Sequence, residues 1–310
     1  MEFGRISEQE LAVTDFTLPP DPAANATVLK GVRVEKPLLY FGGTRWASNT
    51  WIGRIYPKGA KDAAFLEHYV QFFNSIELNA THYQVYGPSV IGKWAAKAAG
   101  KDFRFCPKVP QSISHYSNFN NVYDITTSFL EGVLAFGENL GPVFLQVSEK
   151  YAPDRKNSLF RYLESLPVDI QFFVEVRHED WFADKIIQQE LLTVLRSLNM
   201  GIVITDTPGR RDVAHMTLTI PKTFIRYVGN STTPVDYARI DAWVKRLQYW
   251  VEQGLQELYV FPHMLDEATC PLLTAYMEDK LLAACNLPLR HRNPRQPGQP
   301  VQGTQISFFD

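Results

Sequence analysis

From Pro37 onward the chain repeats one pattern, in which a short apolar run and a few polar residues precede a longer amphipathic stretch. The apolar runs are about five to eight residues long and rich in β-branched or aromatic residues, as is typical of buried strands. We count eight such runs, which begin at Pro37, Ser75, Asp102, Gly141, Ile170, Met200, Lys222 and Gln256.

Stretches with helical spacing follow each run except the sixth, whose connection, residues 207–219, lacks a clear helix. They cover residues 63–73, 88–99, 125–141, 157–166, 185–199, 239–254 and 271–285. Strands that alternate with helices indicate a parallel sheet with crossover connections, and eight strands close a barrel. The pattern therefore predicts an α/β fold, a TIM-type (β/α)₈ barrel. An open doubly wound sheet is the rival, although no GxGxxG follows the first strand.

The pattern divides the chain into three parts. Residues 1–36 form an N-terminal extension, in which TLPPDPAANAT (17–27) has loop composition. Residues 37–285 form the barrel. Residues 286–310 are rich in Pro, Gln, Arg and Gly, and predict a flexible, disordered tail.

Composition narrows the class of protein. Apolar residues make up 45% and charged residues 21%, as in ordinary globular proteins. The net charge of −2 provides no global basic field for nucleic acid, although a local basic cleft stays possible. The three cysteines lack CxxC spacing, which favours a reducing compartment. Neither a signal peptide nor an apolar run of about 18 residues is present, so we expect a cytoplasmic protein.

Candidate chemistry lies at the ends of the strands, because barrel sites are built on the carboxyl-terminal face. Side chains alternate along a strand, so strand phase indicates which of them point inward. The polar residues near strand ends are Glu77, Asn79, Lys108, Gln146, Glu175, Arg177, Asp206, Arg226 and His263. Any one of them has a structural explanation as part of an internal ion pair. Three acidic residues, Glu77, Glu175 and Asp206, converge with three basic residues. The basic residues are Lys108, Arg177 and Arg226, and this convergence favours a ligand site.

Loops after the strands add histidines and aromatic residues. These are Trp46 and Trp51 after the first strand, Tyr83 after the second, His115 after the third, and His178 and Trp181 after the fifth. Aromatic rings around a charged pocket can stack on a sugar or a base. Alternatively, Trp51 and Trp181 simply cover the mouth of the barrel.

Two kinds of chemistry are compatible with these residues. A metal centre would draw on Glu77, Glu175, Asp206 and His263, but no HxH or HxxxH spacing supports it. A metal-free site would use Lys108, Arg177 and Arg226 as an anion clamp, because guanidinium forks suit phosphate and carboxylate. Glu175 or His115 would then act as general acid or base, which makes Glu175, His115 and Lys108 the catalytic candidates. We assign no metal or other cofactor on this basis; a divalent metal is the alternative.

Several of these residues lie in motifs that carry a resemblance. GTRWASNTWIGRIYP, FFNSIELNATHYQVY, FRFCPKVPQSISH, GPVFLQV, FFVEVRHEDWF and FIRYVGN occur in this order and resemble the YecE-like family, domain of unknown function 72, from about Gly42 to Ala275. The resemblance implies a TIM-type barrel but no settled activity. The residues that match its motif positions are Asn79, Tyr83, Lys108, His115, Glu175, Arg177, His178, Trp181 and Arg226.

The chain departs from the family pattern at two places near the expected pocket. After Arg226 the family usually has His-Gly, where this chain has Tyr227-Val228-Gly229. At the eighth strand it usually has two Asn residues, where this chain has Pro262-His263. Ligand preference is therefore expected to differ here.

The tail ends in QISFF, which resembles the pentapeptide that binds the bacterial DNA sliding clamp. Gln305, Ile306, Ser307 and Phe309 fit that pattern, and Phe308 replaces the usual Leu. A flexible tether that presents apolar anchors suits a pocket on a partner. Docking of Phe308 and Phe309 back onto the barrel, or no role at all, are the alternatives. Loss of clamp binding on deletion of 305–310 is the test.

Three functions remain open from the sequence. The first is a hydrolase or nuclease that acts on a phosphate-containing substrate, small molecule or nucleic acid, and is recruited by the clamp. The second is a non-catalytic module that binds a small anionic or sugar ligand in the same pocket. The third is a sugar isomerase-like enzyme, which would use Trp46, Trp51 and Trp181 to bind an uncharged sugar.

Overall fold

All eight apolar runs form strands in the computed structural model, which describes residues 3–230 and 233–290. The prediction of eight strands is confirmed. In chain order they are β1 (Leu38–Phe41), β2 (Ser75–Leu78), β3 (Arg104–Pro107), β4 (Val143–Gln146), β5 (Phe172–Glu175), β6 (Gly201–Asp206), β7 (Lys222–Val228) and β8 (Glu257–His263).

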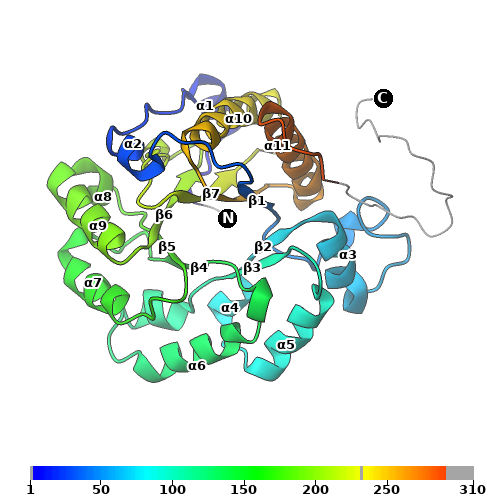
Figure 1. Cartoon of the computed structure of the whole chain (residues 1–310), viewed down its shortest axis with the longest axis horizontal. Coiled ribbons are helices and arrows are strands. Elements are labelled where there is room, and N and C mark those ends of the chain that lie inside the picture. Colours follow the sequence, from blue (N-terminus) through cyan, green and yellow to red (C-terminus); the bar gives the residue numbers. More distant parts are fainter. Residues whose placement is uncertain (1–2, 231–232, 291–310) are drawn as a thin grey trace.

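The strands pair in parallel, in a six-stranded sheet of order β1-β8-β7-β6-β5-β4 and a two-stranded sheet of β2 and β3. Backbone hydrogen bonds link the two sheets at both edges. The Glu77 amide donates to the Gly43 carbonyl at 3.1 Å, and the Val109 amide donates to the Phe144 carbonyl at 3.0 Å. The chain therefore has an α/β fold whose parallel strands surround a common centre (Figure 1).

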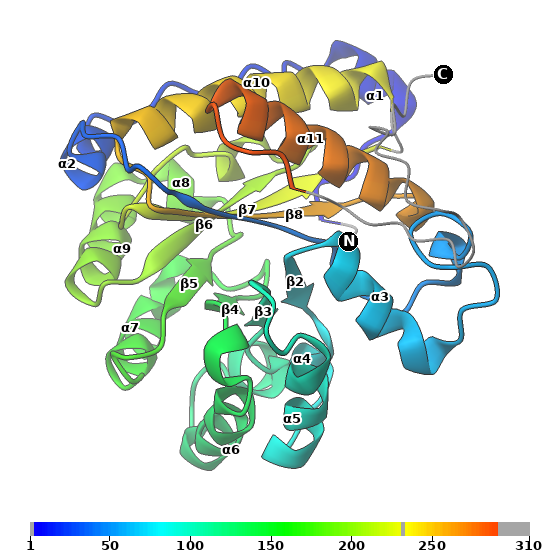
Figure 2. The same cartoon turned by 45° about the vertical axis from the view of Figure 1, so that its right-hand side comes forward.

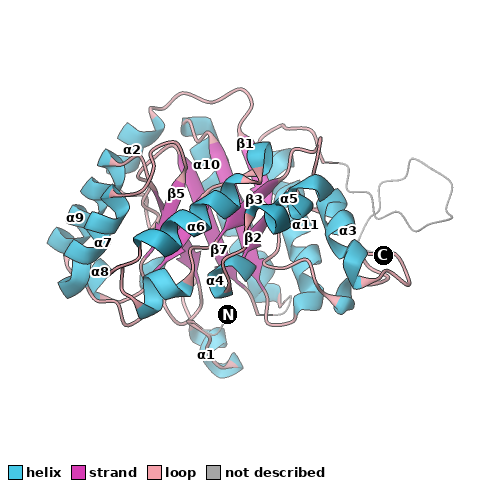
Figure 3. Cartoon of the chain, turned by 90° about the horizontal axis from the view of Figure 1, so that it is seen from below, coloured by secondary structure: helices cyan, strands magenta, loops and turns pink. Residues whose placement is uncertain are grey.

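The predicted helices lie outside the strands, where they cover the outward faces of the sheet (Figures 1 and 3). The long ones are α3 (Phe65–Phe72), α5 (Pro88–Lys97), α6 (Tyr123–Leu134), α7 (Lys156–Glu164), α9 (Lys185–Ser197), α10 (Pro234–Gln253) and α11 (Cys270–Ala284). Two four-residue helices, α4 (Ala80–Tyr83) and α8 (Asp180–Ala183), follow β2 and β5 directly. As predicted, the sixth connection carries no α-helix, only a 3-10 turn at Arg211–Val213.

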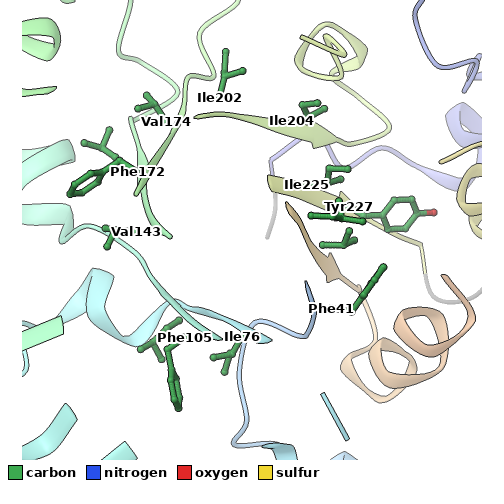
Figure 4. Packing of buried hydrophobic residues seen from close by; sticks show 14 of the residues in the cluster. Phe41, Ile76, Phe105, Val143, Phe172, Val174, Ile202, Ile204, Ile225 and Tyr227 are labelled. Atoms are coloured by element: carbon green, nitrogen blue, oxygen red, sulfur yellow. The ribbon is translucent and has the colours of Figure 1, made fainter. Parts of the chain in front are cut away.

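Alternation along the strands separates the buried apolar residues into two clusters. Outward residues such as Ile76, Phe105 and Phe172 pack under the helices (Figure 4). The inward residues form a second cluster, which consists of Tyr40, Cys106, Phe144, Phe173, Val203, Ile220, Phe224, Tyr259 and Phe261. This aromatic floor, as we name the second cluster, fills the centre between the strands, and the next inward residue on most strands is polar.

The amino-terminal extension packs against the strands and helices. The prediction of a loop at 17–27 is wrong at its end, because Ala24 begins helix α2 (Ala24–Leu29). Asn25 in α2 is buried and bonds the backbone beyond β6: its amide donates to the Met216 carbonyl at 2.8 Å and its carbonyl accepts from the Leu218 amide at 2.9 Å. Loop composition did not reveal these tertiary bonds, which hold the segment in place.

A first helix, α1 (Glu8–Val13), lies near the start of the chain. Ser7 and Glu10 form a capping box at its amino end, which satisfies backbone donors there. Figure 2 shows α1 beside the long helix α10. The described part of the extension therefore contains two short helices, α1 and α2.

The tail prediction falls on residues 291–310, which lie outside the described residues, and so do Gln305, Ile306, Phe308 and Phe309. Within 3–230 and 233–290, none of the helices combines the length and apolar character needed to cross a bilayer.

Candidate functional site

Above the aromatic floor, the last inward residues of the strands form a buried polar layer. It consists of Glu77, Lys108, Gln146, Glu175, Arg177, Thr205, Arg226 and His263, which come from six strands and from residues just beyond β3 and β5. The register brings them together, because Gln146 pairs with Glu175 and Thr205 pairs with Arg226. We name this set the polar layer.

Arg226 lies at the centre of the polar layer and binds both of its carboxylates. Its Nε and Nη2 donate to the two oxygens of Glu77, each at 2.8 Å, and its Nη1 donates to Glu175 Oε2 at 2.7 Å. A bidentate guanidinium–carboxylate pair is geometrically specific. Arg226 is therefore fixed in place, and most of its donors are occupied by protein.

Glu175 is bound from three sides. Besides Arg226, its Oε1 accepts from Arg177 Nε and from Thr205 Oγ1, both at 2.8 Å. Burial opposes ionisation of Glu175, but the charges of Arg177 and Arg226 outweigh it and lower its pKa to about 2. Burial also opposes ionisation of Glu77, yet Arg226 and His263 hold its pKa well below the ordinary value. Both carboxylates are thus ionised at neutral pH.

Lys108 adds a third cation to this layer. Two guanidiniums, Arg177 and Arg226, pair with the two buried carboxylates. Glu149 lies 3.7 Å from Arg177, but its side chain is 56% exposed, so solvent screens its charge. Lys108 Nζ donates to the neutral Gln146 Oε1 at 2.8 Å. Burial, and then the charge of Arg226, lower the pKa of Lys108 to about 7. Within the part of the chain that the structure describes, this ammonium forms no direct ion pair and bonds a neutral amide.

Histidines border the layer in neutral form. His263 Nε2 lies 3.0 Å from Glu77 Oε2, and burial lowers the pKa of this ring to about 4 despite the carboxylate. His115 packs edge-on against His82, with ring centroids 5.0 Å apart. Burial and the nearby charges of Lys108 and Arg177 lower the pKa of His115 to about 4. At neutral pH these imidazoles can accept or donate hydrogen bonds without adding charge.

Asp206 does not belong to this layer, contrary to the sequence prediction. On β6, Thr205 points inward, so the next residue faces the helices. Asp206 pairs there with Arg239 at 3.0 Å and with Arg211, and it accepts from Trp243 Nε1 at 2.7 Å. The prediction failed because the last residue of a strand need not have the inward phase.

The tryptophans are also placed differently from the ligand-stacking prediction. Trp51 and Trp181 are fully buried, and their indole N–H groups donate to the carbonyls of Glu267 and Tyr151, at 2.7 and 2.9 Å. Trp46 is half-buried and packs edge-on against Trp94, with ring centroids 5.2 Å apart. Trp51 and Trp181 have no exposed face on which a sugar or base could stack, because they pack in the outer core.

The remaining predicted residues divide between the layer and the surface. Asn79 Nδ2 donates to Glu77 Oε1 at 2.9 Å, so Asn79 supports the layer. Tyr83 is 73% exposed. The side chain of His178 lies 3.5 Å from Asp180 and is 27% exposed. The structure thus brings together Asn79, Gln146 and Arg177 with the charged residues, and leaves Tyr83 and His178 outside.

Two contributors were missed by the sequence reasoning. Thr205 binds Glu175. It stands one residue before Asp206 on β6, so the two side chains point to opposite faces, and an outward Asp206 would have indicated an inward Thr205. Phe3 covers Arg177, with its ring centroid 4.4 Å from the guanidinium carbon. No sequence signal pointed to Phe3, because it contacts loops more than 170 residues away in the chain.

The alternative metal set is not assembled. Glu77 and His263 are in contact, but Glu175 is held by two arginines and Asp206 faces the helices. In the part of the chain that the structure describes, no group of three or more His, Cys, Asp and Glu side chains is arranged to hold a metal ion.

Parallel strands with helices outside them, and with charged residues near the strands' carboxyl ends, define an α/β protein. A family model described as "Protein of unknown function DUF72" matches residues 40–298, and the chain belongs to this family. The family expected from the sequence motifs is confirmed.

Relatives and solved structures agree with this assignment. The chain is 28% identical over 254 residues to UPF0759 protein YecE of Escherichia coli K12, which covers 76% of this chain and 90% of the relative, with the same values for the O157:H7 protein. Two crystal structures of a DUF72 family protein from Enterococcus faecalis V583 superpose with TM-scores of 0.60 and 0.61. They share 16% and 14% identity and cover 84% and 82% of this chain and 99% and 100% of theirs, so they support the fold alone.

Proposed function

We propose that the polar layer binds a phosphate-bearing anion and that Lys108 supplies the charge that recognises it. One observation carries the proposal: among the described residues the layer holds three buried cations and two buried carboxylates, and Lys108 bonds a neutral amide. A buried ammonium without a counter-ion is costly, and an anion that reaches it recovers that cost as binding free energy.

The proposal changes the anion clamp expected from the sequence. Arg226 and Arg177 bind the carboxylates of Glu77 and Glu175. The two guanidiniums therefore contribute positive potential and hold the carboxylates in place, and they do not bind the ligand in bidentate fashion. Lys108 is then the direct contact, as a point charge with up to three donors. Gln146, which accepts from Lys108, fixes the position of the ammonium.

We also propose that the eight strands form one closed TIM-type barrel. The hydrogen bonds that connect β2 with β1 and β3 with β4 across the two sheets support this. In a closed barrel the polar layer has its carboxyl-terminal face as the natural approach for a ligand.

Hydrolysis of the bound phosphate compound is the reaction we propose for the site. His115 is the candidate general base, because its ring is neutral at neutral pH and its pKa of about 4 lies nearer to neutrality than that of Glu175. Glu175 is a positioning residue in this scheme: a carboxylate with a pKa of about 2 is a weak base. Lys108 would stabilise the negative charge that develops on the phosphate oxygens.

A non-catalytic ligand-binding module is the second candidate, and the three-sided binding of Glu175 favours it, since the layer then lacks a free carboxylate. The sugar isomerase-like function has less support, because Trp51 and Trp181 are buried in the outer core. Hydrolysis of a generic phosphodiester to a phosphomonoester and an alcohol, followed by release of the alcohol, distinguishes the enzyme from the binding module. Its loss in His115→Ala with phosphate binding retained would assign the base.

Recruitment to the bacterial DNA sliding clamp, and through it to nucleic acid, stays a proposal that rests on the sequence of Gln305–Phe309. It is independent of the polar layer. Clamp binding that survives deletion of 305–310 would end it without affecting the anion site.

The anion proposal is tested by titration of inorganic phosphate at pH 6, where Lys108 is protonated. We expect Lys108→Met to weaken binding at least tenfold. Lys222→Met is the matched control, because Lys222 pairs with Glu257 at 2.6 Å at the start of β7, at the opposite end of the strand from Arg226, and should bind as the unaltered chain does. Equal affinity in all three proteins would overturn the proposal.

A further inference from the structure

Phe3, near the start of the chain, covers Arg177 at the edge of the polar layer. Phe3 is buried, and its ring lies 4.4 Å from the guanidinium carbon of Arg177 and 5.4 Å from that of Arg210. Arg210 in turn donates to the Arg177 carbonyl at 2.9 Å, so the two arginines belong to one surface. We name this surface, with Thr207 and Gly209, the ring subsite.

Backbone contacts hold Phe3 in the ring subsite. Thr207 Oγ1 lies 3.1 Å from the Phe3 carbonyl and 3.0 Å from the Gly4 carbonyl, to either of which it can donate, and the Gly209 amide donates to Gly4 at 2.7 Å. Gly4 has a φ of +68°, and a Cβ there would lie 2.4 Å from Thr207. The chain is thus seated closely on loops that follow β6, with no room for a side chain at Gly4.

The ring subsite adjoins the anion site through Arg177. Its Nε donates to Glu175 at 2.8 Å, and its charge contributes to the environment of Lys108. The bond to Glu175 fixes the plane of the guanidinium, and a fixed guanidinium face is a surface on which planar aromatic rings stack. Lys108, Gln146 and Arg177 are each less than 7% exposed, and Phe3 covers Arg177, so a ligand reaches the Arg177 face only when Phe3 moves.

We propose that the ring subsite receives an aromatic ring of the ligand and that Phe3 occupies it as an intramolecular substitute. The proposal rests on the proposed function and narrows it: the ligand class is an anion that carries phosphate next to an aromatic group. Phe3 and such a ligand compete for the Arg177 face, whereas an anion without a ring gains nothing there.

The test compares phenyl phosphate with inorganic phosphate, each titrated calorimetrically at pH 6 into the full chain, Phe3→Ala and Phe16→Ala. Phe16 is the matched control, since its ring also stacks on two arginines, Arg239 at 4.8 Å and Arg211 at 5.3 Å, away from the polar layer. We expect phenyl phosphate to bind Phe3→Ala at least tenfold more tightly than the full chain or Phe16→Ala. Inorganic phosphate should change less than twofold.

Three results would be informative. An unchanged phenyl phosphate affinity in Phe3→Ala, including no binding to any protein, overturns the ring subsite. An equal gain for both ligands overturns it too, because Phe3 would then be a general cover. A gain for phenyl phosphate that persists in Phe3→Ala/Lys108→Met supports the ring subsite and contradicts the anion role of Lys108. Phe3→Leu, which keeps apolar packing without an aromatic face, provides the same comparison if the Ala variant unfolds.

Discussion

The chain buries two clusters of charge at the same end of its sheet, and they differ in balance. The polar layer lies on the inward side of the strands, and among the described residues its three cations face two carboxylates. The outer cluster lies between β6, β7 and α10 and consists of Asp206, Arg211, Asp236, Arg239 and Trp243. Its two carboxylates face two guanidiniums, so it is neutral without a ligand.

In the outer cluster, aromatic rings and a backbone amide also contact the charged groups. The Arg239 guanidinium carbon lies 4.4 Å from the Tyr227 ring and 4.8 Å from the Phe16 ring, and Asp236 accepts from the Asn230 amide at 2.8 Å. Buried charge by itself therefore does not mark a ligand site. An unbalanced charge, as at Lys108, is the more useful signal.

The largest expected effect comes from removing the central arginine of each cluster. Arg226→Met leaves Glu77 and Glu175 buried without their shared partner, and we expect a loss of about 3–5 kcal/mol in the free energy of unfolding. Arg239→Met should cost less, about 1–3 kcal/mol, because Asp206 keeps Arg211 and Trp243. Denaturant unfolding measures both. An equal or larger loss in Arg239→Met would contradict the comparison.

A smaller effect is the pH dependence of anion binding, which distinguishes the two clusters. Sulfate keeps its charge between pH 6 and 8, so its affinity reports the protonation of the protein. Because the pKa of Lys108 is lowered to about 7, the ammonium is lost as pH rises through that value, and sulfate affinity should fall about tenfold from pH 6 to pH 8. Calorimetry with Lys108→Arg should show a flat profile, whereas Arg211→Met in the outer cluster should retain the fall. A flat profile in the unaltered chain would count against the surplus ammonium.

The smallest effect is a gain in stability. The pKa of Lys108 is lower in the folded chain than in the unfolded chain, so the unfolded chain binds more protons between pH 7 and 10.5, and stability rises with pH in that window. Lys108→Met should therefore raise the free energy of unfolding at pH 6 by about 1 kcal/mol, because a buried charge is replaced by an apolar chain. In this variant Gln146 Oε1 loses Lys108 as a donor but still accepts from Arg226 Nη1, which lies 3.4 Å away. A lower melting temperature in Lys108→Met would show that its charge is already paired.

Much of the fold was readable from the sequence because strand periodicity and crossover spacing are local signals. The same periodicity correctly grouped Glu77, Lys108, Glu175 and Arg226, whose contacts span up to 149 residues. It was less reliable at a strand end, where Asp206 has the outward phase.

What the sequence did not reveal depends on contacts across the chain. Trp51 and Trp181 follow strands in loop-like segments, yet their indoles pack into the outer core, which a local pattern does not encode. Phe3 lies in a short polar segment, and its position over Arg177 depends on the loop after β6. Balance of charge likewise needs coordinates, because a list of acids and bases does not say which of them meet.

The aromatic floor has a consequence for traffic through the site. Phe144, Phe173, Phe224 and Phe261 fill the centre beneath the polar layer, so these rings close one end of the proposed site. A ligand of that site would therefore enter and leave at the same end. If the proposed hydrolysis takes place, the two products would leave in order, and the one nearer the carboxyl ends of the strands would leave first.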